Sequence, residues 1–277
     1  MTSSHATNPG LVRQNNEDCV RTDDSLRIYL LADGMGGHNA GEVASILAVE
    51  TAYTALSSKI ANTATDGLFD LMVSAIHAAH CEISTKARTS LSFMGMGTTL
   101  VVAVVRETTA YIAHAGDSRC YLFSLPPFQG EGRGGDGVDC KISVNGQNQP
   151  HPPPNLPLER GGTKLQRITN DHTMGDQLLA NGIPREKIPE KQFHNLTQAV
   201  GCGAPPIPDF NTVELNKGDI LLLCSDGLTD MLTDAAIETI LSNGDASLGT
   251  LPESLIDAAN AKGGRDNISV VLVKHGA

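Results

Sequence analysis

Short apolar runs that end at an aspartate beside a glycine recur along this chain, and this pattern constrains the fold most. The run at residues 28–32 leads directly into Asp33-Gly34, and the run at 219–224 leads, after one serine, into Asp226-Gly227. Runs of this length and composition are typical of strands buried on both faces. An aspartate at a strand end can point into a shared cleft, and the glycine beside it lets backbone or ligand approach closely. The pattern therefore predicts buried strands that carry a common acidic site at their ends.

The remaining periodicity predicts the class of fold. Apolar residues at helical spacing predict helices at residues 42–60, 68–87, 174–181, 233–241 and 252–261. Further β-branched and apolar runs predict strands at residues 98–105, 109–113, 120–124, 165–169 and 268–273. The polar link at 106–108 predicts a hairpin. Along the sequence the long helices are separate from the strands, and short turns join many of the strands. We therefore expect an α+β fold with antiparallel sheets.

The segment 124–163 has a different composition from the rest of the chain. It holds seven of the 14 prolines and eight of the 28 glycines, and its apolar periodicity disappears. We expect a disordered, passive insertion within a single domain that spans residues 1–277. The alternative is a proline-rich ligand for a partner domain, but the run at 151–154 is too short to favour it.

Composition excludes several classes of function. The 31 acidic and 20 basic side chains give a formal charge of −11, and aromatic residues make up only 4% of the chain, so we expect no nucleic-acid partner. No apolar stretch reaches the roughly 18 residues of a membrane helix, and no secretory signal is visible. The six cysteines form no C-x-x-C pair, which favours the reduced thiols of a cytoplasmic protein.

The acidic pairs predict a metal site. They are Asp33-Gly34, Gly116-Asp117, Asp226-Gly227 and Asp266-Asn267. Converging carboxylates without basic partners would raise one another's pKa unless a cation neutralised them. A site made only of oxygen ligands suits Mg²⁺, Mn²⁺ or Ca²⁺ and not Zn²⁺. Each pair alone is an ordinary turn dipeptide, and only the repetition after buried strands favours a site.

An ordered set of motifs then supports a resemblance. Its blocks are Arg13 with Asn16-Glu17-Asp18, the run Ala32 to His38 with Gly41-Glu42, Gly97-Thr98-Thr99, Gly116-Asp117-Ser118-Arg119, Asn170-Asp171-His172, residues 196–201, Ser225-Asp226-Gly227 and Gly264 to Ser269. The set resembles the PPM family, the metal-dependent protein serine/threonine phosphatases of type 2C, in its bacterial branch. It covers residues 6–274 except the Pro/Gly-rich segment. The resemblance implies a four-layer α-β-β-α sandwich of two antiparallel sheets flanked by helix pairs, with the metal site in a cleft at one end.

The resemblance also implies a ligand set. Asp33 would bridge two Mn²⁺ or Mg²⁺ ions, the Gly34 carbonyl would ligate one of them, and Asp226 and Asp266 would complete the other. Asp117 matches a residue that helps to hold a weaker third ion.

Further roles follow from the same blocks. Glu17 and Asp18 would hold waters on the ions, and Arg13 would grip the substrate phosphate. Some family members carry a histidine directly after Asp-Gly as a general acid. Met35 stands there in this chain. His38, three residues on, is one candidate for the general acid, and a metal-bound water is the other.

The function that the resemblance implies is hydrolysis of phosphoserine and phosphothreonine in proteins by a water activated between two metals. Such an enzyme needs no cysteine nucleophile, and no C-x5-R loop is present, so we interpret Cys224 as a buried strand residue. The alternatives are a phosphatase of small phosphate esters and a catalytically silent phosphoprotein-binding module.

The resemblance also bears on partners. It implies phosphoprotein substrates of a Ser/Thr kinase in bacterial signal transduction, and a flap at 171–200 beside the metals. We expect a cytoplasmic monomer that binds neither nucleic acid nor membrane.

Overall fold

A computed structural model describes residues 1–277 except 37–39, 125–142, 145–163, 244–245 and 277. Within the described residues, the strands are β1 (Thr2–Asn8), β2 (Asp18–Asp23), β3 (Ile28–Met35), β4 (Gly97–Thr98), β5 (Leu100–Arg106), β6 (Thr109–Ala115), β7 (Arg119–Ser124), β8 (Ser143–Val144), β9 (Lys164–Arg167), β10 (Asp209–Glu214), β11 (Ile220–Cys224) and β12 (Ile268–Lys274). The α-helices are α1 (Ala40–Ser57), α2 (Leu68–Ala87), α3 (Met174–Ala180), α4 (Asp226–Thr229), α5 (Asp234–Leu241) and α6 (Leu251–Ala261).

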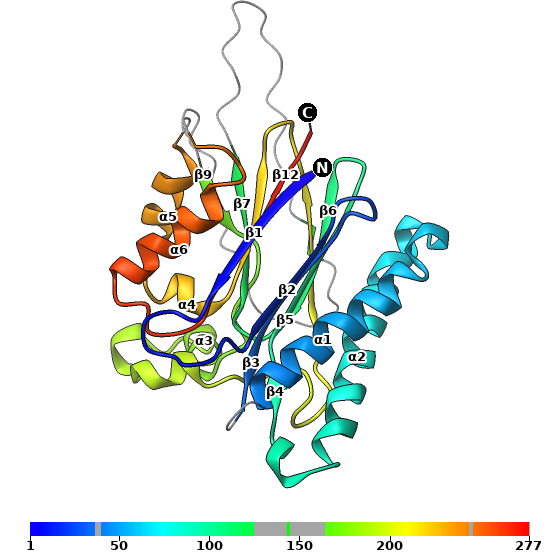
Figure 1. Ribbon diagram of the computed structural model, residues 1–277, viewed down its shortest axis with the longest axis vertical. Helices are drawn as coiled ribbons and strands as arrows, with labels where there is room; N and C mark the ends of the chain where they lie inside the picture. Colours follow the sequence, from blue (N-terminus) through cyan, green and yellow to red (C-terminus); the bar gives the residue numbers. More distant parts are fainter. Residues whose placement is uncertain (37–39, 125–142, 145–163, 244–245, 277) are drawn as a thin grey trace, which may run out of the picture.

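The strands form two antiparallel sheets that lie face to face (Figure 1). One sheet has the order β1-β12-β11-β7-β9. The other has the order β2-β3-β5-β6-β10-β8, with β4 paired to β3. The expected hairpin is β5–β6, in which Arg106 pairs with Thr109. The expectation of antiparallel sheets in an α+β fold is therefore confirmed.

Strands buried on both faces create the layers. Along β3, Ile28, Leu30 and Ala32 pack into a cluster with α1 and α2, while Tyr29 and Leu31 point toward the other sheet. Successive side chains of a strand face opposite sides, so one apolar run can fill two cores.

The second sheet repeats this arrangement, and its outer face packs against α4, α5 and α6. The result is the four-layer α-β-β-α sandwich that the resemblance implied, with a helix group on each outer face (Figure 1).

Most expected elements agree with the structure at their bounds within a few residues, and α2 spans the predicted range. The helix expected at 42–60 begins earlier and ends earlier, as α1. Buried alanines at every fourth position, Ala40, Ala44, Ala48 and Ala52, let α1 lie close to β3 and α2. Cys224 is fully buried in β11, as interpreted.

Besides β8, which falls within the expected insertion, three strands lacked a sequence signal. In β1 only Ala6 is buried, and β2 and β10 mix polar and apolar residues, so neither reads as an apolar run. Register with a neighbouring strand, for example β1 with β12, places them in the sheets.

Two further findings concern the segments around the sandwich. Of the expected insertion at 124–163, only Ser124 and β8 are described, β8 pairing with β10, and the rest lies outside the described residues. Among the helices that the structure describes, none combines the length and apolar character needed to cross a bilayer.

Candidate metal centre and cleft

The β2–β3 pair brings the first two carboxylates together. Asp18 begins β2 and lies directly opposite Asp33 in β3. Thr99 holds the backbone at Asp33, since its Oγ1 accepts a hydrogen bond from the Asp33 amide at 2.9 Å. The Asp33 carbonyl in turn accepts a bond from the Thr98 hydroxyl at 2.7 Å. The backbone that carries Asp33 is therefore fixed from the neighbouring strand.

The other sheet supplies two more carboxylates. Asp226 begins α4 just after β11, and Asp266 lies just before β12. Ser225 joins the sheets, because its Oγ donates to Asp18 Oδ2 at 2.8 Å and accepts from the Ser269 amide at 2.9 Å.

Asn267 makes a second link between the two sheets. Its Oδ1 accepts from the Glu17 amide at 2.8 Å, and its Nδ2 donates to the carbonyls of Pro9 and Asn15. Residues far apart in the sequence thus meet at one end of the sandwich.

Asp117 enters from the turn between β6 and β7. Gly116 precedes it with φ of +112°, and a Cβ there would lie 2.6 Å from Thr99 Cγ2, so only glycine fits this turn. Ser118 is buried and bonds Thr99 through the two hydroxyls at 2.7 Å. The turn is therefore fixed to Thr99, the same residue whose hydroxyl accepts the hydrogen bond from the Asp33 amide.

One cleft of about 1180 Å³ collects the predicted site residues. Its lining includes Arg13, Glu17, Asp33, Gly34, Asp117, Asp226 and Asp266. Asp18 is buried behind them. Among the site residues that the sequence predicts, His38 has no described position, because residues 37–39 lie outside the described part of the chain.

Close backbone packing shapes the cleft edge. A Cβ on Gly34 would lie 2.1 Å from the Gly41 carbonyl oxygen, and a Cβ on Gly41 would lie 2.8 Å from the Glu17 carboxylate. Arg13, half exposed, donates from Nη2 to Asp266 Oδ2 at 2.6 Å. The cation predicted to bind phosphate therefore stands beside a predicted metal ligand.

The electrostatics fit divalent cations. Burial raises the pKa of Asp18 to about 6, although hydrogen bonds with Ser269 and Ser225 act in the opposite direction. Burial and the charges of nearby aspartates raise the pKa of Asp226 to about 7. Burial and neighbouring carboxylates also raise the pKa values of Asp33 and Asp117 well above their ordinary range. Asp18 Oδ1 is buried without a hydrogen-bond partner. Crowded carboxylate oxygens with an orphaned acceptor are the donor set that Mn²⁺ or Mg²⁺ prefers.

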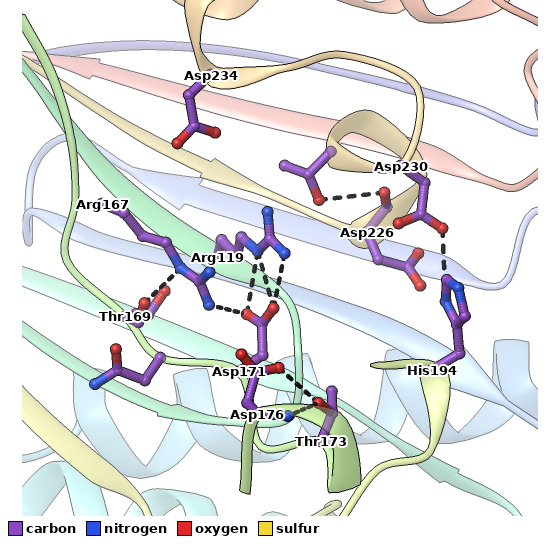
Figure 2. A network of polar contacts seen from close by, with 12 residues as sticks. Arg119, Arg167, Thr169, Asp171, Thr173, Asp176, His194, Asp226, Asp230 and Asp234 are labelled. Carbon is purple, nitrogen blue, oxygen red and sulfur yellow. Dashed lines mark hydrogen bonds and ion pairs between the residues drawn. The ribbon is translucent and has the colours of Figure 1, made fainter. Parts of the chain in front are cut away.

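The flap region carries a second polar network beside the cleft (Figure 2). Arg119 donates to Asp171 from Nε at 3.1 Å and from Nη2 at 2.7 Å, and Arg167 also pairs with Asp171. Arg119 and Arg167 therefore both pair with Asp171, at the start of the flap segment.

Sequence reasoning missed two residues at the cleft. His194 Nδ1 lies 3.6 Å from Asp230 Oδ2, and both residues line the cleft near Asp226 (Figure 2). Asp230 follows Asp226 by four residues, the spacing of neighbours on one helix face, which was the available signal. His194 had none, because only the flap's folding brings it there.

A cleft lined by aspartates at the end of two facing antiparallel sheets indicates a protein that binds divalent cations. Comparisons with known proteins give the family. A family model described as Protein phosphatase 2C matches residues 3–124. The serine/threonine phosphatase stp of Listeria innocua is 32% identical over 279 residues, covering 99% of this chain and 96% of the relative. Protein phosphatase PhpP of Streptococcus pneumoniae is 33% identical over 282 residues, covering 99% and 97%.

A solved structure agrees. The catalytic domain of the serine threonine protein phosphatase PstP, in complex with two manganese ions, superposes with a TM-score of 0.72 at 30% identity, covering 99% of this chain and 97% of that one. The chain belongs to the protein phosphatase 2C family, also called PPM.

Proposed function

We propose that this chain hydrolyses phosphoserine and phosphothreonine in proteins with two Mn²⁺ or Mg²⁺ ions in its cleft. The observation that carries the proposal is the convergence of Asp18, Asp33, Asp117, Asp226 and Asp266 from both sheets, with one buried carboxylate oxygen unpartnered. The family membership and the manganese-bound relative support the same reading.

We assign the ion-holding roles as follows. Asp33 and the Gly34 carbonyl would hold ions from β3, while Asp226 and Asp266 would hold them from the other sheet. Asp117 would help to hold a third, weaker ion. When bound, the ions supply an activated water for attack at phosphorus and positive charge for the phosphoryl oxygens.

The chain's own residues orient the substrate. Glu17 and Asp18 position water molecules in the cleft. The Arg13 guanidinium has five N–H donors, so it can keep Asp266 and still present donors to a phosphate oxygen. Attack forms a bond from a water oxygen to phosphorus and breaks the bond to the side-chain oxygen. The products are inorganic phosphate and a free hydroxyl, whose proton would come from His38 or from a water in the cleft.

The cellular setting is part of the proposal. The enzyme would remove the phosphate groups that a Ser/Thr kinase adds to proteins in bacterial signal transduction. It would act as a cytoplasmic monomer, with residues 1–277 as a single catalytic domain. The relatives named as a serine/threonine phosphatase and a protein phosphatase support the phosphoprotein substrates in this proposal.

Activity assays test the mechanism. We expect hydrolysis of p-nitrophenyl phosphate and of a phosphothreonine peptide with Mn²⁺ and none with a chelator. A competition assay between the phosphothreonine peptide and sugar phosphates distinguishes the two kinds of phosphatase. A phosphatase of small esters would hydrolyse the sugar phosphates in preference to the peptide, and a protein phosphatase would not.

Substitutions provide the matched comparison. Asp33→Asn and Asp226→Asn each remove a charge from the proposed ion site, so each should reduce kcat/KM by more than the roughly 100-fold that loss of an outer-shell partner costs. Asp257→Asn changes an exposed aspartate on α6 and should leave activity unchanged. Turnover that survives chelation or either cleft substitution would refute the two-ion mechanism.

A further inference from the structure

One face of α2 holds the loop at 199–207 through three side chains. His80 Nδ1 accepts a hydrogen bond from the Gly201 amide at 3.0 Å, and Ser84 Oγ donates to the Gly201 carbonyl at 2.9 Å. His77 Nε2 donates to the Pro206 carbonyl at 2.9 Å. His77, His80 and Ser84 are three and four residues apart, the spacing of one helix face. The helix therefore binds the loop's backbone at two places.

The contact leaves no space between loop and helix. Gly201 has φ of +98°, and a Cβ there would lie 2.1 Å from Ile83 Cγ2. On its other side, Val200 exchanges two backbone hydrogen bonds with Thr98, at 2.8 and 2.9 Å. Both polar backbone groups of Gly201 are thus satisfied by α2, and loss of either side chain leaves a buried group unpaired.

The loop forms a wall of the same cleft that holds the carboxylates. Its lining residues are Ala199, Cys202, Gly203, Ala204, Pro205, Pro206 and Ile207, none of which is charged. Ile207 is 78% exposed, and its amide is held by Gln198 Oε1 at 2.7 Å. In Figure 1 this yellow segment lies beside α2, near β4. The cleft is acidic where phosphate would react and apolar along this wall.

We propose that this wall receives the polypeptide next to the phosphorylated residue, with His80 and Ser84 as the positioning residues that fix it. The proposal rests on the proposed function. A peptide whose phosphothreonine reaches Asp33 and Asp226 extends along the cleft, where Ile207 offers contact to an apolar side chain. A small phosphate ester has no group to place there.

Kinetics on two substrates test the proposal. His80→Ala removes the acceptor for Gly201, so we expect KM for a phosphothreonine peptide with apolar flanking residues to rise roughly three- to tenfold. KM for p-nitrophenyl phosphate should rise much less. His80→Asn should restore peptide KM, because its side-chain oxygen can accept the same bond. Glu82→Gln, exposed on α2, is the control and should change neither constant.

The outcomes separate the two proposals. A wild-type chain without manganese-dependent activity refutes the proposed function and this proposal with it. An active wild type whose His80→Ala variant shows an equal change for both substrates, or none, refutes this proposal alone. If His80→Ala does not fold, Ile207→Ser decides, because this exposed change leaves the core intact. It must raise KM for the peptide more than for the small ester.

Discussion

Asp171 is the buried carboxylate that joins the flap segment to the sheet, and its replacement by asparagine tests this link. Its side chain is 6% exposed and accepts bonds from both Arg119 and Arg167 (Figure 2). Arg119 also donates to the Tyr121 hydroxyl, which donates to Asp234. The carboxylate therefore balances two guanidinium groups that come from β7 and β9.

The expected magnitude follows from burial. Removing one partner of a buried ion pair costs about 3–5 kcal/mol. Arg119 and Arg167 keep 23% and 27% of their side-chain surface exposed, so water offsets part of this loss. Asparagine also retains one acceptor oxygen. We therefore expect Asp171→Asn to lower the free energy of unfolding by about 3 kcal/mol, and Tm by roughly 6 °C at about 2 °C per kcal/mol for a domain of this size.

Thermal and denaturant unfolding followed by circular dichroism measures this effect. Asp257→Asn, exposed on α6, is the control and should shift Tm by less than about 1 °C. A double-mutant cycle with Arg167→Gln should give a coupling energy of about 1–3 kcal/mol. A loss below about 0.5 kcal/mol for Asp171→Asn, or additive effects in the cycle, would show that the network does not stabilise the fold.

Two further predictions concern pH and the Pro/Gly-rich segment. Burial, with the neighbouring charge of His172, lowers the pKa of His114 to about 4. An unfolded histidine has a pKa near 6.5, so the unfolded chain binds a proton at a higher pH than the folded chain does. The free energy of unfolding is therefore highest above about pH 6.5, and it falls by about 3 kcal/mol as the pH decreases toward 4. His114→Gln should flatten this slope in denaturant unfolding across that range, and an unchanged slope contradicts the assignment. Replacing residues 126–161 by a short turn should leave Tm and manganese-dependent activity nearly unchanged, because the entropic cost of closing a loop grows slowly with its length. A large loss of Tm or of activity would show that the segment is not a passive insertion.

The sequence by itself determined the strands and helices with strong apolar patterns. The runs around Ile28, Leu221 and Val270 are apolar at nearly every position, which predicted strands buried on both faces, and the structure buries them. The repetition of Asp-Gly pairs after such runs also favoured an acidic site, because carboxylates that converge need a cation to neutralise them. The order of the motifs along the chain indicated the family. Neither the composition nor the apolar periodicity could indicate it.

Only the tertiary structure decided the pairings on which the site depends. The register of β2 and β3 places Asp18 opposite Asp33. Ser225, 207 residues further along the chain, donates a hydrogen bond to Asp18. Such contacts cannot be predicted from the local sequence, because they form only when the two sheets pack face to face. The same holds for His80 and Gly201, which meet across 121 residues. Side-chain type and local pattern are encoded residue by residue, whereas the convergence of charges in one cleft is a property of the packed layers.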